Sequence, residues 1–287
     1  MHIDVLADGL GFTEGPVWLP DGRVALTSIS HGCVYVVDPA GGPRDRIVTG
    51  GGPNGLALGP DGHLYVAQNG GIFGAASSAP AGVQIIIDGR VDYFATGMDA
   101  PNDLVFGPDG RLWVTDTRSG IDYTALQDAP QGWVWRCAPG GSAQLVLEDG
   151  PVFVNGLGFS PDGASLLLTA TLSSQLLAYQ VAEAGTRTPT RPRLVHTFDN
   201  GWPDGMVVSP SGQAWVALTA ADRIDVVNED GARCAAIDLP PGSLATNVCI
   251  GGALLDELYV TTAHSQSVLR LRFDERDPIS LTSAVAP

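Results

Sequence analysis

Short apolar runs alternate along the chain with turns rich in glycine, proline, aspartate and asparagine. The runs contain many β-branched and aromatic residues, and no stretch of ten or more residues has a convincing helical period. In the middle of the chain, for example, this pattern predicts strands at 111–116, 132–137 and 143–148. The chain is therefore predicted to be all-β.

A short phrase recurs six times along the chain. It has a polar residue, then small or apolar residues, and in most copies a turn of the Pro-Asp-Gly kind; clear copies begin at Pro53, Pro101 and Val154. The polar residues of the six copies, called the anchors below, are Glu14, Asn54, Asn102, Asn155, Asp204 and Asn247. The anchors are spaced by 40, 48, 53, 49 and 43 residues. Repeats of about 40–50 residues, each with four strands, are typical of a β-propeller.

The sixth repeat is one strand short. The segment His2–Ala7 has the character of the missing outer strand, and it stands directly before the first anchor. A strand supplied from the other end of the chain joins the two ends by hydrogen bonds and protects a sheet edge. We therefore expect residues 1–287 to form a single six-bladed β-propeller domain, closed by the N-terminal strand.

The composition limits the partners and the compartment. With 15 basic and 31 acidic residues the net charge is −16, which argues against nucleic acid and anionic membranes as partners. The N-terminus has no signal-peptide pattern, and no apolar run is long enough to span a bilayer. The four cysteines are scattered, which favours reduced, buried thiols. These features predict a cytoplasmic protein; its oligomeric state is left open.

The anchors form a candidate site because the first strand of each propeller blade lines the central axis. All six have short side chains that carry oxygen, and two, Glu14 and Asp204, are carboxylates. Hard cations such as Ca²⁺, Mg²⁺ and Mn²⁺ bind such oxygens, and open coordination positions would remain for water and substrate. Asn-Gly and Asp-Gly are also common turn formers, so a repeated fold signature is the competing reading. That reading does not explain Glu14, because glutamate is a poor turn residue.

Two connections are long, at 69–82 and 116–132. Both follow the second strand of a blade, where the chain has returned to the anchor end, so we expect them to overhang the anchors. Phe73 and Tyr123 in these loops are candidates for contacting a ligand. His264, at the end of the second strand of the last blade, is a further candidate.

Four segments together resemble the family of regucalcin (senescence marker protein), gluconolactonases and related lactone hydrolases. They are EGPVW at Glu14, PNDLVFGPDGRLWVTD from Pro101, NGLGFSPDG from Asn155 and PDGMVVSPSG from Pro203. The resemblance covers nearly the whole chain, in the family's order and spacing. It implies a six-bladed propeller that holds one divalent cation (Ca²⁺, Zn²⁺, Mg²⁺ or Mn²⁺) on its axis.

The resemblance also implies roles for single residues. The implied metal ligands are Glu14, Asn155 and Asp204, with Asn102 at or next to the metal. No metal role carries over to the remaining anchors, which we expect to contact substrate or a central water: Asn54 and Asn247. A segment resembling Asn69–Gly71 occurs in the sugar-lactonase branch, so Asn69 is a further candidate for substrate binding.

The chain departs from the family at one position that handles sugar hydroxyls. Regucalcin has an arginine two positions before the asparagine that corresponds to Asn102, and this chain has Ala100 there. Arg118, in the second long loop, is a candidate replacement.

Together these features predict a metal-dependent hydrolase that opens a lactone, a sugar lactone above all, by attack of water. The cation would stabilise the developing oxyanion, Asp204 would act as general base, and Asn102 and Asp103 would position water or substrate. Three alternatives remain at this stage. One is a phosphotriesterase-like hydrolase on the same metal, the second is a propeller that binds a partner or calcium without turnover, and the third is an isomerase or carbon–carbon lyase on the same fold.

Overall fold

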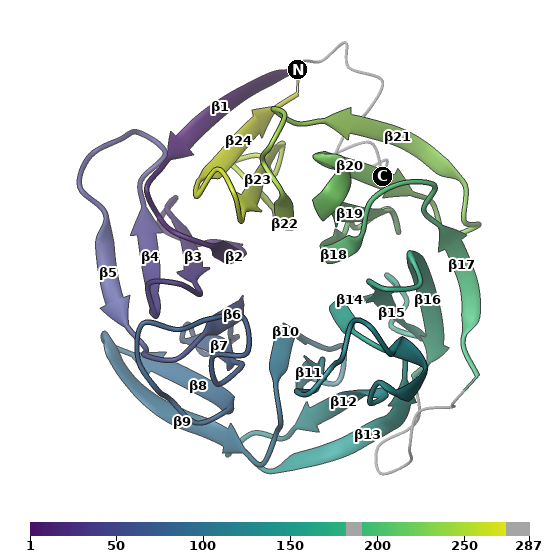
Figure 1. Ribbon diagram of the computed structural model, residues 1–287. Coiled ribbons are helices and arrows are strands. Elements are labelled where there is room, and N and C mark those ends of the chain that lie inside the picture. Colours follow the sequence, from purple (N-terminus) through teal and green to yellow (C-terminus); the bar gives the residue numbers. More distant parts are fainter. Residues whose placement is uncertain (182–190, 274–287) are drawn as a thin grey trace.

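The computed structural model describes residues 1–181 and 191–273, which contain 24 β-strands arranged as six four-stranded antiparallel sheets around a central axis (Figure 1). The predicted all-β, six-bladed propeller is confirmed. That all 287 residues belong to one domain stays a prediction, because 182–190 and 274–287 lie outside the described residues.

The strands of blades 1 to 3 follow the chain from the axis outwards. Blade 1 has β2 (Thr13–Trp18), β3 (Val24–Ser28), β4 (Cys33–Val37) and β5 (Asp45–Val48). Blade 2 has β6 (Pro53–Leu58), β7 (Leu64–Gln68), β8 (Gly82–Ile87) and β9 (Arg90–Thr96). Blade 3 has β10 (Pro101–Phe106), β11 (Leu112–Asp116), β12 (Gly132–Cys137) and β13 (Ala143–Gly150), with the 3₁₀-helix η1 (Leu126–Asp128) before β12.

Blades 4 to 6 repeat this order. Blade 4 has β14 (Val154–Phe159), β15 (Ser165–Ala170), β16 (Gln175–Gln180) and β17 (Arg193–Thr197). Blade 5 has β18 (Pro203–Val208), β19 (Ala214–Leu218), β20 (Arg223–Val227) and β21 (Arg233–Asp238), with the 3₁₀-helix η2 (Thr219–Ala221) before β20. Blade 6 has β22 (Ala245–Gly251), β23 (Glu257–Thr262), β24 (Val268–Arg272) and, outermost, β1 (His2–Ala7).

The N-terminal strand closes the ring as predicted. β1 pairs antiparallel with β24, with His2 opposite Arg272. An exposed ion pair between Arg272 Nη2 and Asp4 Oδ2, 2.6 Å apart, joins the same two strands. Strand pairing between the two ends of the chain therefore holds blade 6 together.

The core lies between neighbouring blades. β3, β7, β11 and β19 are buried along their whole length, whereas outer strands such as β9 consist mostly of exposed and partly buried residues. Trp215 of blade 5 packs in one apolar cluster with Leu258 and Val260 of blade 6. Trp113 of blade 3 packs in the same way against Leu157 of blade 4. Burial between blades fixes the positions of the strands that line the axis.

The Pro-Asp-Gly turns lie at the end of the propeller opposite the anchors. In blade 3 the Asp109 carboxylate accepts the N–H of Arg111 at 3.1 Å, and Gly110 has φ +70°. The aspartates of the first, second and fourth turns accept the N–H two residues ahead in the same way. Such Asx turns explain why this phrase repeats in the sequence.

The cysteines differ in part from the prediction. All four cysteines carry free thiols, but Cys234 is exposed and Cys249 is only partly buried, so the prediction that all are buried holds for Cys33 and Cys137 and is wrong for Cys234. Cys234 lies on the outermost strand of its blade, where one face meets solvent. No helix within residues 1–181 and 191–273 is long and apolar enough to cross a membrane.

Candidate active site

The anchors lie near the start of the innermost strands, at points where strand pairing is irregular. In blade 3, Pro101 pairs with Asp116 and Leu104 pairs with Val114, so that Asn102 and Asp103 lie opposite the single residue Thr115. A register shift occurs near the anchor in all six blades. Such bulges re-aim side chains and are common beside active sites. The six innermost strands surround the axis in Figure 1, as predicted.

Glycine follows the anchor in four blades because the next blade packs against it. A Cβ on Gly156 would lie 2.6 Å from the backbone oxygen of Asp204, and a Cβ on Gly205 would collide with the side chain of Asn247. Without these glycines, neighbouring anchors could not approach each other.

Threonines orient the anchors of blades 3 and 4. The Thr117 hydroxyl donates to the backbone oxygen of Val154 at 2.7 Å and accepts from Asn102 Nδ2 at 2.8 Å. The Thr171 hydroxyl donates to the backbone oxygen of Pro203 at 2.8 Å and accepts from Asn155 Nδ2 at 3.3 Å. Each amide nitrogen is therefore occupied, which leaves the amide oxygen free to face a ligand.

Blade 5 uses the same arrangement for a carboxylate. The Thr219 hydroxyl donates to Asp204 Oδ2 at 2.9 Å. This hydrogen bond fixes one carboxylate oxygen and leaves the other available.

Blade 2 differs from these three blades. Asn54 and Asn69 stand in the positions of the anchor and its threonine, and both side chains are buried. Asn69 Oδ1 accepts the N–H of Gly71 at 2.7 Å. Within the described residues, Asn69 Nδ2 and Asn54 Oδ1 have no hydrogen-bond partner. Blade 2 therefore offers an unused donor and an unused acceptor, each buried.

Glu14 and the anchor of blade 6 complete the ring. The Glu14 carboxylate is buried and accepts the N–H of Gly15 at 3.0 Å. Asn247 Nδ2 donates to Asp103 Oδ2 at 3.2 Å, across 144 positions of sequence. Glu14, Asp103, Asp204 and Asn247 therefore lie near one another, although they come from four blades.

The two carboxylates of the ring, Glu14 and Asp204, and the neighbouring Asp103 have raised pKa values. Burial raises the pKa of Asp204 to about 7, although hydrogen bonds from Thr219 and the nearby Asn155 amide oppose the rise. Burial likewise raises the pKa of Asp103 to about 6. For Glu14, burial and then the charges of Asp204 and Asp103 hold the pKa well above its usual range. Carboxylates crowded together in this way favour a bound cation.

The chemistry of the donors fits a divalent cation. The ring supplies the carboxylates of Glu14 and Asp204 and the free amide oxygens of Asn102 and Asn155, and oxygens are the ligands of hard cations. Across the described part of the chain, no three His, Cys, Asp or Glu side chains form a metal cluster by themselves. Amide oxygens would therefore be part of the ligand set.

The two long loops arise where they were predicted. One joins β7 to β8 and carries Phe73; the other joins β11 to β12 and carries Tyr123, which is 59% exposed. The ring of Phe153, just before β14, lies 5.8 Å from that of Phe73 and 6.4 Å from that of Tyr123. The loops therefore meet through aromatic side chains.

Arg118 is already engaged. Its Nε lies 3.0 Å from Asp99 Oδ2, and its guanidinium carbon lies 3.3 Å from the centre of the Trp133 ring. Its role in binding hydroxyls stays a prediction.

His264 is exposed, and it lies in the turn between β23 and β24. The expected position at the end of a strand is wrong, because β23 stops at Thr262, whose hydroxyl and amide bond to the turn and to Thr13.

Phe153 and the threonines that bind the anchors were not among the candidates predicted from the sequence. Thr115 and Thr169 donate to the backbone oxygens of the next anchors, Asn155 and Asp204, at 2.6 and 2.7 Å. The signal was present, because Thr115, Thr117, Thr169 and Thr171 recur 13 to 16 residues after an anchor. Nothing in the sequence singles out Phe153.

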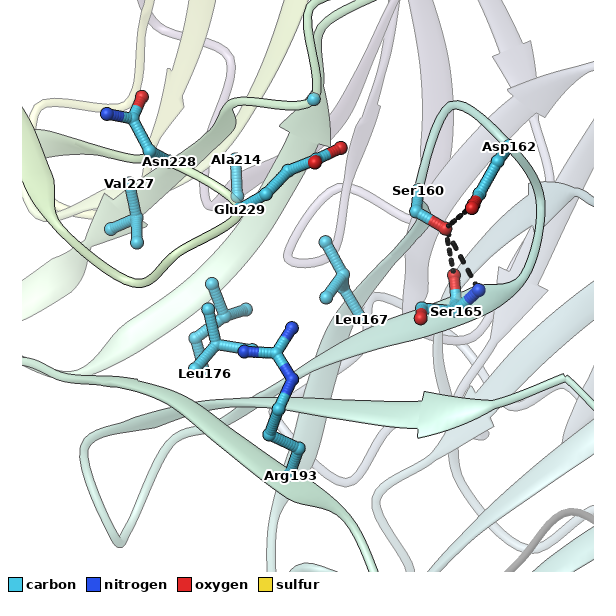
Figure 2. Close-up of a pocket in the computed structure, with 12 residues that line it drawn as sticks. Ser160, Asp162, Ser165, Leu167, Leu176, Arg193, Ala214, Val227, Asn228 and Glu229 are labelled. Atoms are coloured by element: carbon cyan, nitrogen blue, oxygen red, sulfur yellow. Dashed lines mark hydrogen bonds between the residues drawn. The ribbon is translucent and has the colours of Figure 1, made fainter.

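Two cavities lie toward the Pro-Asp-Gly end. A cavity of about 440 Å³ occupies the axis there, with apolar walls such as Leu56 and Val105, and reaches Asp103 and Asn247. A smaller one of about 200 Å³ lies between blades 4 and 5, with Arg193 beside Leu176 on one side and Glu229 beside Ala214 on the other (Figure 2). Of the anchors, only Asn247 lines either cavity.

Comparisons with known proteins agree with this architecture. The chain is 30% identical to the pentonolactonase of Haloferax volcanii over 253 residues, covering 87% of this chain and 81% of that protein. It is 27% identical to the gluconolactonase of Zymomonas mobilis, covering 94% and 81%. The solved structure of a calcium-binding regucalcin from Agrobacterium tumefaciens matches with a TM-score of 0.74 at 19% identity, covering 93% and 92%.

The family model described as the SMP-30/gluconolactonase/LRE-like region matches residues 12–264. This range contains all six anchors and both long loops. The chain therefore belongs to the SMP-30/gluconolactonase/LRE-like family.

Proposed function

We propose that this protein is a divalent-cation-dependent lactonase that opens a sugar lactone to its hydroxy acid. Relatives named as pentonolactonase and gluconolactonase support the hydrolysis of a lactone. The observation that carries the proposal is the convergence of Glu14 and Asp204 with two asparagines whose amide oxygens are left free by threonines.

Glu14, Asp204, Asn155 and Asn102 would hold the cation. When bound, it supplies Lewis-acid stabilisation of the charge that develops on the lactone carbonyl oxygen. The threonines keep the amide and carboxylate oxygens directed at the axis, so little reorganisation is required.

Asp204 would serve as the general base. Thr219 holds one of its oxygens, and a bound cation would keep the carboxylate ionised and able to accept a proton. It takes a proton as water attacks the carbonyl carbon. The ring C–O bond then breaks, and the leaving alkoxide receives a proton to become the hydroxyl of the product. Asp103, hydrogen-bonded to Asn247, would position water or substrate on the side of the axial cavity.

Blade 2 supports a hydroxylated substrate. Substrate hydroxyl groups could donate to Asn54 Oδ1 and accept from Asn69 Nδ2, which would give each unpaired atom a partner. A lactone without hydroxyls would leave them unpaired. A sugar lactone is the substrate class that suits this pair.

Acid release from a panel of sugar lactones, unsubstituted lactones, simple esters and a phosphotriester tests the proposal. We expect turnover of sugar lactones, and a loss of about a thousandfold or more in kcat for Asp204→Asn. An Asp204→Asn variant that keeps wild-type turnover would remove Asp204 as the base. Cation binding without turnover of any compound would identify a binding protein instead.

A further inference from the structure

Three aromatic rings from separate segments meet beside the anchor ring. Phe73 comes from the β7–β8 loop, Tyr123 from the β11–β12 loop and Phe153 from the residue before β14. Phe153 is the centre of the group, because its ring contacts both of the others. We call these three side chains the aromatic wall.

The backbone of Phe153 is held in an uncommon conformation. Its φ is +57°, a left-handed value that residues other than glycine seldom adopt. Strained positions of this kind cluster at ligand-binding and active sites. The conformation places the ring with the two loops rather than in the inter-blade core that contains its neighbour Val154.

One residue, Thr171, is hydrogen-bonded both to the aromatic wall and to an anchor. The Phe153 backbone oxygen accepts the N–H of Thr171 at 3.2 Å, and the Thr171 hydroxyl accepts from Asn155 Nδ2. Phe153 also lies only two residues before Asn155. The position of the wall is therefore coupled to the position of a predicted metal ligand.

The wall is open to solvent on one side. Tyr123 is 59% exposed, and Phe73 and Phe153 are partly buried. Ligand sites commonly combine such aromatic surfaces with a few polar groups. Here the polar groups are the anchors, and the wall supplies the flat, apolar side.

The charges around the wall disfavour an anionic ligand. Arg118 is the sole arginine or lysine in the two long loops, and Asp99 pairs with its charge. The ring contributes the carboxylates of Glu14 and Asp204, and Asp103 lies beside Asn102, so that even with a divalent cation bound the site would have no excess positive charge to attract an anion. A phosphate or carboxylate on the substrate would meet repulsion without a compensating cation.

We propose that Phe73, Tyr123 and Phe153 bind the carbon face of a neutral lactone ring and hold its carbonyl toward the anchors. This inference rests on the proposed lactonase function and names its substrate class: neutral lactones, rather than phosphorylated or carboxylated ones. Phe153 is the central specificity residue of the wall.

Binding of a neutral sugar lactam, which resists hydrolysis, tests the wall independently of turnover. Calorimetry on cation-loaded protein should show a Kd about tenfold weaker in Phe153→Leu and Phe73→Leu than in wild type, because leucine keeps apolar volume but not the flat ring. Leucine also has a Cβ, so the strain at φ +57° is unchanged. Phe94→Leu, in the packing around Tyr65, is the matched control and should leave Kd unchanged.

Kinetics on lactones give the second readout. The two wall variants should raise KM about tenfold with kcat within about threefold of wild type, the signature of lost uniform binding. Wild type should favour a neutral sugar lactone over its phosphate ester by about a hundredfold in kcat/KM. Wall variants with wild-type Kd, or equal use of the phosphorylated lactone, overturn the inference. Tight lactam binding without turnover rejects the proposed function and leaves the wall supported.

Discussion

Blades 3, 4 and 5 differ from blade 2 at the same place in the fold. In blades 3 to 5 a threonine binds the anchor side chain, and the anchor oxygens that remain are the predicted cation ligands. In blade 2 an asparagine replaces the threonine, and polar atoms of Asn54 and Asn69 are left unpaired. The same repeated scaffold thus provides the proposed cation ligands in blades 3 to 5. In blade 2 it leaves polar atoms that only a ligand could hydrogen-bond. The repeat determines where the anchor side chains lie, and the identity of each side chain determines its role.

The largest effect is expected at the proposed cation ligands. Glu14→Gln removes one of the two carboxylate ligands while keeping a similar shape, so cation affinity and kcat should both fall by about a thousandfold. Isothermal titration with Ca²⁺ and Mn²⁺, together with acid release from a sugar lactone, measures both. Unchanged cation affinity would remove Glu14 from the ligand set.

The threonines should matter less, because they act through the anchors. Thr171→Val keeps the shape but loses the acceptor for Asn155 Nδ2, so cation affinity should fall about 10- to 100-fold. Thr197→Val, on the exposed outer strand β17, is the matched control and should bind the cation like wild type. Equal affinities in the two variants would show that the threonine does not orient Asn155.

A change in blade 2 should weaken substrate binding and leave cation binding intact. Asn54→Ala removes a buried acceptor that lacks a partner, so the thermal stability of the free protein should change by no more than about 2 °C. Cation affinity should also be unchanged. KM for a sugar lactone should rise about tenfold, and KM for an unsubstituted lactone should not. A loss of cation affinity would place Asn54 among the cation ligands.

The smallest effect concerns pH. Without a cation, the folded Asp204 has a pKa of about 7 against an ordinary value of 3.8, so between these values the folded state holds a proton that the unfolded chain releases. The contribution of Asp204 to stability is therefore fully present below its ordinary pKa of 3.8 and is lost as pH rises through about 7. The Tm of chelated protein should fall by several degrees from about pH 5 to pH 8, and a saturating divalent cation should abolish the fall. A Tm that rises over this range in chelated protein would contradict the raised pKa.

The sequence predicted the features that repeat. Six copies of one phrase reveal the strands, the ring closure and the anchors, since the same turn chemistry recurs in several blades. It did not predict features that occur once. The contact between Asp103 and Asn247 joins distant repeats, and the conformation of Phe153 has no local sequence signal. The threonine positions were hidden because Asn69 and Ile29 occupy them in other blades.

Lactone hydrolysis by this protein should depend on a divalent cation that the ring of anchors holds. The most direct measurement follows acid release from a neutral sugar lactone by one protein sample before chelation, after chelation and after titration with Ca²⁺ or Mn²⁺. Activity should disappear on chelation and return in proportion to one bound cation per chain. Full activity in protein shown to be free of metal would contradict this dependence.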